Sequence, residues 1–244
     1  MDWDQGFLFH PDERALLMHT HDMYFPNFGN VFLLLDPNKS PMNPNWFPYG
    51  SLPIYLLKIA GEILTLGSDP SIITLSKIGR SLSVSADIGT IIFSFLIARN
   101  WHNRTTGFLT AIFISTCVLH IQLSHFFAVD TLLTFFITGS LWFMIQHTKN
   151  YKFYNGAIAA ILAGFAISTK ISALPILLPI IIANYLHFTN KVNHINEANR
   201  PVACVRNLLL PLFIAGITFF ITSPYALLDF NEFFGDIKEQ SLMA

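Results

Sequence analysis

The fold is decided by residues 154–188, which read YNGAIAAILAGFAISTKISALPILLPIIIANYLHF. Two apolar runs, 154–170 and 172–188, meet at Lys170, and each is close to the ~20 residues that a helix needs to cross a bilayer. Gly and Pro within such runs are tolerated where neighbouring helices pack closely. Together with four similar runs elsewhere, the pattern predicts an all-α protein, a polytopic membrane helical bundle. The other four runs are 78–98, 107–126, 129–146 and 207–225.

The composition supports a membrane protein. Apolar residues make up 52% of the chain and charged residues 12%, against roughly 25% charged residues in a soluble domain. The formal net charge of −1 argues against a nucleic-acid partner, because such binding needs a basic face. Two cysteines, one of them inside an apolar run, offer neither an expected disulfide nor the spacing of a zinc site.

Three segments follow from this pattern. Residues 1–77 are predicted to be an extracytoplasmic loop with a short helix near Glu13–His21 and an interfacial or re-entrant helix within 49–67. Residues 78–226 form the six-span bundle, and 227–244 begin the next extracytoplasmic segment. Because six spans put both ends of the chain on one side and no signal peptide is visible, we expect a truncated chain that lacks a first span.

The charges between the runs predict the orientation. The links Arg99–Arg104, Gln146–Lys152 and His187–Arg206 contain seven basic residues and one acidic residue, Glu197. By the positive-inside rule these links are cytoplasmic. The acidic face, with Asp12 and Glu13, then lies outside. We therefore expect a multi-pass protein of the plasma membrane whose active site faces the extracytoplasmic side.

Several ionisable residues map to that outer side. Ionised side chains at membrane depth are costly, so Arg80, Asp130 and Lys170, near the ends of predicted spans, indicate a polar pocket that opens outward. The competing interpretation is that they are helix-end charges in the headgroup region, with Lys and Arg reaching toward water.

Seven short motifs follow one another along the chain, namely His10-Pro11-Asp12-Glu13, Tyr49–Pro53, Gly79–Ser83, Phe127–Thr131, Ser168–Lys170, Thr222–Tyr225 and Leu228–Phe230. In order and position they are similar to bacterial and archaeal members of the protein mannosyltransferase group, family 39, whose fold also includes the aminoarabinose transferase of lipid A. The resemblance implies a C-type glycosyltransferase transmembrane module, here lacking the first span and everything after the seventh. It covers essentially the whole chain.

The resemblance implies a reaction. Such enzymes transfer a sugar, here mannose or another hexose, from a polyprenyl-phosphate carrier to an acceptor hydroxyl with inversion. The general base falls on Asp12, and a carboxylate within hydrogen-bond reach of a hydroxyl suits that role. Glu13 would orient the base or bind the acceptor. Pro11-Asp12-Glu13-Arg14 is also a favourable first turn of a helix, and both readings can hold together.

The leaving group of this reaction is a phosphate ester, which calls for cationic ligands. Arg80 and Lys170 are predicted to bind the donor phosphate, because Arg matches phosphate oxygens bidentately and Lys supplies a point charge. Asp130, His10 and Tyr49 are predicted to bind substrate. Asp130 could contact the sugar, orient Arg80 or help to bind a metal. The predicted partners are the lipid-linked donor, the bilayer, and an acceptor protein, glycan or lipid.

Some side chains of the N-terminal loop are of types that bind metals, and the charges within the spans allow a second function class. His19, His21 and Asp22 offer metal-ligand types, as does His125 near Asp130, but no full ligand set is visible. We therefore predict no cofactor and no metal site, although a divalent metal is possible. The alternatives to an enzyme are a transporter or flippase-like protein that uses Asp87 and Asp130, or an inactive fragment of the enzyme. The enzyme requires Asp12 on the outer face, whereas a transporter needs its charges at mid-membrane.

Overall fold

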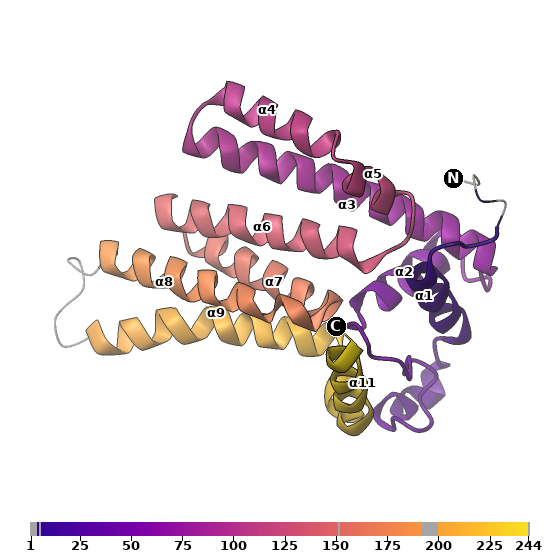
Figure 1. Cartoon of the computed structure of the whole chain (residues 1–244). Coiled ribbons are helices and arrows are strands. Elements are labelled where there is room, and N and C mark those ends of the chain that lie inside the picture. The colour runs from indigo at the N-terminus through magenta and orange to yellow at the C-terminus, as the bar shows by residue number, and fades with distance from the viewer. Residues whose placement is uncertain (1–3, 5, 151, 192–199, 244) are drawn as a thin grey trace.

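A computed structural model describes residues 4, 6–150, 152–191 and 200–243. Within these residues every regular element is a helix, so the predicted all-α membrane bundle is confirmed (Figure 1). The first part of the chain contains α1 (Pro11–Asp22), the 3₁₀ helix η1 (Phe28–Leu35) and α2 (Leu52–Leu64). The bundle consists of α3 (Ile72–Trp101), α4 (Arg104–Ser115), α5 (Val118–Ser124), α6 (Val129–Asn150), α7 (Phe153–Thr169), η2 (Ile171–Ile176), α8 (Leu177–Lys191) and α9 (Arg200–Thr222), followed by α10 (Tyr225–Leu228) and α11 (Phe230–Met243).

All six predicted runs fall on helices, but not all are straight helices of full length. Four helices are long and apolar enough to cross a membrane, within Ile72–Trp101, Val129–Asn150, Ile171–Thr189 and Val205–Thr222. The run at 107–126 is divided between α4 and α5, which are bent by 61° and would together make a fifth span. The run at 154–170 forms α7, which has 17 residues and is therefore about 25 Å long.

Small residues on α7 allow the helices around it to approach closely. Ala159, Ala160 and Ala163 are buried, and a Cβ atom on Gly164 would come within 2.7 Å of the Ala215 carbonyl oxygen in α9. On the other side of α7, Ser140 of α6 donates a hydrogen bond of 2.7 Å to the Ala159 carbonyl. Small residues and inter-helix hydrogen bonds are the usual means of helix association in lipid.

The two ends of the bundle differ. Helices α1, α2 and α11 gather at the end where α6 begins and α7 ends, whereas the α3–α4 and α6–α7 links lie at the opposite end (Figure 1). The predicted basic links at 99–104 and 146–152 are thus separated from Asp12 by the length of the bundle. Residues 192–199 of the third basic link, including Glu197, lie outside the described residues. The side of the membrane on which each end lies stays a prediction.

Candidate active site

Four of the predicted site residues converge at the α1 end of the bundle. The Lys170 ammonium lies 3.1 Å from Asp130 Oδ1 and 5.4 Å from the centroid of the Tyr49 ring. Burial raises the pKa of the Tyr49 hydroxyl to about 12, and the charge and hydrogen bond of Asp12 add to the shift, as does the charge of Asp130. Tyr49 is therefore the residue that joins Asp12 to the Lys170–Asp130 pair.

Three of the four side chains lie at the end of an element, and Tyr49 lies in the loop before α2. Asp12 follows Pro11 in the first turn of α1, where a carboxylate is favoured by the helix dipole. Asp130 occupies the first turn of α6. Lys170 ends α7 in an extended conformation, with φ −154° and ψ 122°. The site is thus built where helices begin or end, at the boundary of the predicted spans.

The backbone of Gly50 holds Tyr49 against the end of α7. Its amide donates a hydrogen bond of 3.1 Å to the Thr169 carbonyl, one residue before Lys170. A Cβ atom at position 50 would lie 1.9 Å from the Ser168 carbonyl oxygen. Only glycine allows this approach, so Gly50 fixes the separation of Tyr49 and Lys170.

Arg80 and Glu13 form a second cluster, which sequence reasoning placed in the substrate pocket. Arg80 Nε and Nη2 donate to the Glu13 carboxylate at 2.8 and 2.9 Å, and Nη1 donates to Asp4 Oδ1 at 3.1 Å. The three residues are buried, with exposed fractions of 2% for Arg80, 0% for Glu13 and 3% for Asp4. The Arg80 guanidinium holds the pKa of Asp4 at about 2. Two carboxylates thus already neutralise the proposed phosphate ligand.

The cluster joins three parts of the fold. Besides Arg80 of α3, the Glu13 carboxylate accepts a hydrogen bond of 3.2 Å from the Phe127 amide, in the corner that leads into α6. This contact ties the start of α1 to the corner that precedes Asp130. Asp4 was missed by sequence reasoning, because an isolated acid near the N-terminus carries no local signal of a buried partner.

His10 lies at the N-cap of α1, two residues before Asp12. Its ring centroid is 4.9 Å from that of Phe126. Within the described part of the chain, its Nδ1 atom is buried and makes no hydrogen bond. The structure therefore brings His10 to the α5–α6 corner, and its predicted contact with substrate stays a prediction.

A groove of about 390 Å³ opens beside Asp130, between α5 and the start of α6. One wall carries His120, whose Nδ1 is 2.8 Å from Asp87 Oδ1 in α3. This contact gives a partner to Asp87, the residue that the transporter alternative uses together with Asp130. The groove is lined by Leu119, His120, Leu123, Asp130, Thr131 and Thr134.

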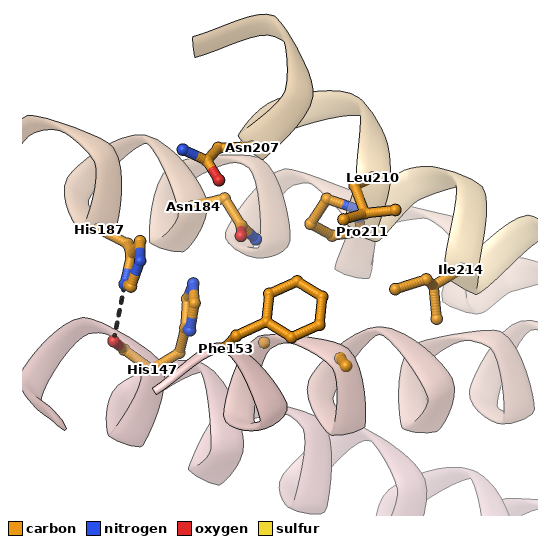
Figure 2. Close-up of a pocket in the computed structure, with 10 residues that line it drawn as sticks. His147, Phe153, Asn184, His187, Asn207, Leu210, Pro211 and Ile214 are labelled. Carbon is orange, nitrogen blue, oxygen red and sulfur yellow. Dashed lines mark hydrogen bonds between the residues drawn. The ribbon is translucent and has the colours of Figure 1, made fainter. Parts of the chain in front are cut away.

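A smaller cavity lies near the opposite end, among α6, α7, α8 and α9 (Figure 2). His147 and His187 stack there with ring centroids 3.9 Å apart, and His187 Nδ1 is 3.2 Å from the His147 carbonyl oxygen. Its volume of about 20 Å³ is close to that of one water molecule. No predicted site residue lines it, and it is too small for a sugar.

Across the described ranges, no group of three or more His, Cys, Asp or Glu side chains is arranged to hold a metal ion. His19, the first residue of the predicted ligand-type stretch, instead stacks on Trp46 with ring centroids 4.9 Å apart.

Comparison with known families gives a direct result. The sequence model of the dolichyl-phosphate-mannose-protein mannosyltransferase family matches residues 79–220, more than half of the chain. The chain belongs to this family. The match runs from α3 to α9 and includes Arg80, Asp130 and Lys170, whereas Asp12 and Tyr49 precede it. No curated protein and no solved structure matches the chain.

Membership confirms the resemblance that the motifs indicated. This member of the mannosyltransferase family is a multi-pass integral membrane protein, and its family points to membrane glycosyltransferase activity. Its four converging residues come from both the matched bundle and the preceding loop.

Proposed function

We propose that the protein transfers a hexose from a polyprenyl-phosphate donor to an acceptor hydroxyl, with inversion at the anomeric carbon. The observation that carries this proposal is the convergence of Asp12, Tyr49, Asp130 and Lys170 at one end of a bundle of this family. A base and a cation at one site are what an inverting displacement with a phosphate leaving group requires.

In this mechanism Asp12 accepts the proton of the acceptor hydroxyl as its oxygen attacks the anomeric carbon. The bond between that carbon and the phosphate oxygen breaks, and the phosphate leaves with the bonding electrons. Lys170 stabilises the charge that develops on the phosphate. The Tyr49 hydroxyl keeps its proton at neutral pH, because its pKa is raised to about 12, and holds Asp12 in place.

In this proposal Glu13 and Arg80 do not contact the reacting atoms but act through the position of Asp12. Their buried pair fixes the start of α1 against α3 and the corner before α6, and it thereby sets the position of Asp12 relative to Asp130. Arg80 is thus a positioning residue, and Lys170 is the residue that meets the donor phosphate. The site faces the extracytoplasmic side of the plasma membrane, as the charge pattern predicts.

A transfer assay with the full-length protein in proteoliposomes and a polyprenyl-phosphate hexose tests the role of Asp12. Asp12→Asn removes the proton acceptor, so transfer should fall by about 10²–10⁴-fold, while donor binding is retained. Asp36→Asn is the control, because Asp36 pairs with the exposed Lys39 in the same loop. Wild-type transfer by the Asp12 variant would remove it from the mechanism.

A further inference from the structure

One face of α1 carries Asp12, which belongs to the catalytic cluster, and extends from there toward the C-terminal end of the helix. Asp12 and His19 are seven residues apart, so they lie on the same face of the helix, about 10 Å from each other along its axis. Trp46 stacks on His19 with an interplanar angle of 14° and meets Tyr49 edge-on, with ring centroids 5.6 Å apart. A row of rings therefore runs from the base to His19.

A polar hollow of about 310 Å³ lies at the far end of this row. Two of its lining residues, Ser40 and Asn43, are nearly buried and are held from behind. The Ser40 hydroxyl hydrogen-bonds to that of Tyr225, and Asn43 Nδ2 donates to Asp229 Oδ2 at 2.9 Å. The hollow is thus formed in advance, because contacts with the segment after α9 fix its floor. Its polar lining residues are His19, Asp22, Ser40, Asn43 and Asn45.

The exposed part of the lining suits hydroxyl groups. Asp22 is exposed and accepts hydrogen bonds, and the exposed Asn45 presents an amide whose Nδ2 also donates to the Asn43 carbonyl at 3.3 Å. His19 Nδ1–H donates to the Pro44 carbonyl at 3.1 Å, which leaves Nε2 as an acceptor in the neutral ring. Burial lowers the pKa of His19, although the charges of Asp22 and Asp236 oppose the shift, so the ring is neutral at pH 7.

The same lining disfavours other acceptors. Carboxylates at Asp22 and Asp236 act on this region, and they repel a phosphorylated or otherwise anionic acceptor. The one large apolar side chain in the lining, Met23, is buried, so apolar side chains of a peptide would find no pocket. The amide, carboxylate and imidazole groups of the lining match the hydroxyl groups of a sugar, which both donate and accept hydrogen bonds.

We propose that this hollow, lined by His19, Asp22 and Asn45, binds a distal sugar of a glycan acceptor, neutral or amino-substituted, whose reacting hydroxyl lies at Asp12. The part of the inference that concerns the reacting hydroxyl rests on the proposed function. Binding of the distal sugar does not, and it is measurable without a donor.

Direct binding tests the proposal. A manno-trisaccharide and a chito-trisaccharide are titrated into the full-length protein without donor, with saturation-transfer NMR and the fluorescence of Trp46 as readouts. At least one should bind, and Trp46→Phe should remove the fluorescence response. If neither binds, or if a Ser/Thr-rich peptide displaces the sugar from this site, the proposal is overturned.

Two substitutions test the location. Asp22→Asn removes a charged acceptor, and Asn45→Gly removes the amide while keeping a residue that tolerates the φ of +46° at this position. Each should weaken trisaccharide binding about tenfold, the value of one good hydrogen bond, with no change in donor affinity. Lys39→Gln, at an exposed position in the same loop, is the control and should bind as the wild type does. Undiminished binding by the Asp22→Asn/Asn45→Gly double variant contradicts the site.

The outcome separates this inference from the proposed function. Asp12→Asn should still bind the trisaccharide where transfer is lost, because His19, Asp22 and Asn45, which hold the distal sugar, are unchanged. If the protein binds the sugar and shows no transfer with any donor, the hollow stands and the transferase mechanism fails. If transfer proceeds to a peptide and the protein binds no sugar, the transferase mechanism stands and the sugar-binding hollow fails.

Discussion

Two cations, Lys170 and Arg80, were predicted to bind the donor phosphate, and their surroundings separate them. The side chains of Lys170 and Asp130 are 30% and 39% exposed, and an ion pair of this kind contributes about 0–1 kcal/mol. Lys170 can therefore exchange Asp130 for a phosphate at little cost. Arg80 is buried between two carboxylates, and disrupting a buried pair costs about 3–5 kcal/mol. The lower cost of breaking its ion pair favours Lys170 as the ligand of the donor phosphate.

Lys170→Gln tests this assignment. Loss of a charge-assisted hydrogen bond is worth about 1.5–3 kcal/mol, so donor affinity should fall roughly 10- to 150-fold, while the thermal midpoint changes little. Equilibrium binding of the polyprenyl-phosphate donor measures the effect. Lys238→Gln, on the exposed face of α11, controls for the loss of a positive charge, and equal affinities of the two variants would exclude Lys170 from the donor site.

At the scale of elements, the site depends on contacts that join the N-terminal loop to the bundle. The Asp4–Arg80–Glu13 cluster fastens α1 to α3 and to the corner before α6. Gly50 fastens the loop before α2 to the end of α7. Each contact positions a residue next to it in sequence, Asp12 in one case and Tyr49 in the other.

Arg80→Met should destabilise the fold by about 3–5 kcal/mol, because two buried carboxylates lose their counter-charge. The thermal midpoint in detergent should fall well below that of Lys170→Gln. An unchanged midpoint of Arg80→Met with a selective loss of donor affinity would return Arg80 to the donor site.

In the wild type, the lowered pKa of Asp4 contributes stability in full above its ordinary pKa of 3.8, and this contribution is lost as the pH falls through about 2.

Gly50→Ala should displace the loop that carries Tyr49, because its Cβ atom would overlap the Ser168 carbonyl oxygen at 1.9 Å. We expect a loss of about 1–3 kcal/mol in stability and reduced transfer by the protein that still folds. Gly216→Ala is the matched control, since nothing lies within 4 Å of a Cβ atom there, and in α9 it should be neutral or slightly stabilising. A Gly50 variant with wild-type melting and transfer would contradict the close approach.

For the whole molecule, the decisive feature is the separation of the two ends of the bundle (Figure 1). The end of the bundle where α3 and α6 finish carries Arg99, Arg104, Lys149 and Lys152, and the end with α1 carries the catalytic cluster. The bilayer lies between these ends if the long apolar helices cross it, so the two sets of charges face different compartments.

Cysteine labelling tests the orientation. With both native cysteines replaced by serine, Lys39→Cys should react in intact cells with a membrane-impermeant maleimide. His102→Cys, in the exposed α3–α4 link, should react only after permeabilisation. The opposite pattern would place Asp12 in the cytoplasm and exclude an extracytoplasmic active site.

By itself the sequence determined the all-α membrane class, the positions of the helices and the family, and it named the four residues that converge among seven predicted site residues. These properties depend on local hydropathy, helix-end signals and short motifs, which are read within a window of about 20 residues. The tertiary structure alone decided that Arg80 and Glu13 pair in a buried cluster with Asp4, that α4 and α5 are bent, and that a polar hollow follows His19. Those features join residues such as Glu13 and Arg80, which are 67 positions apart. Only packing sets whether a charge meets a buried partner or solvent.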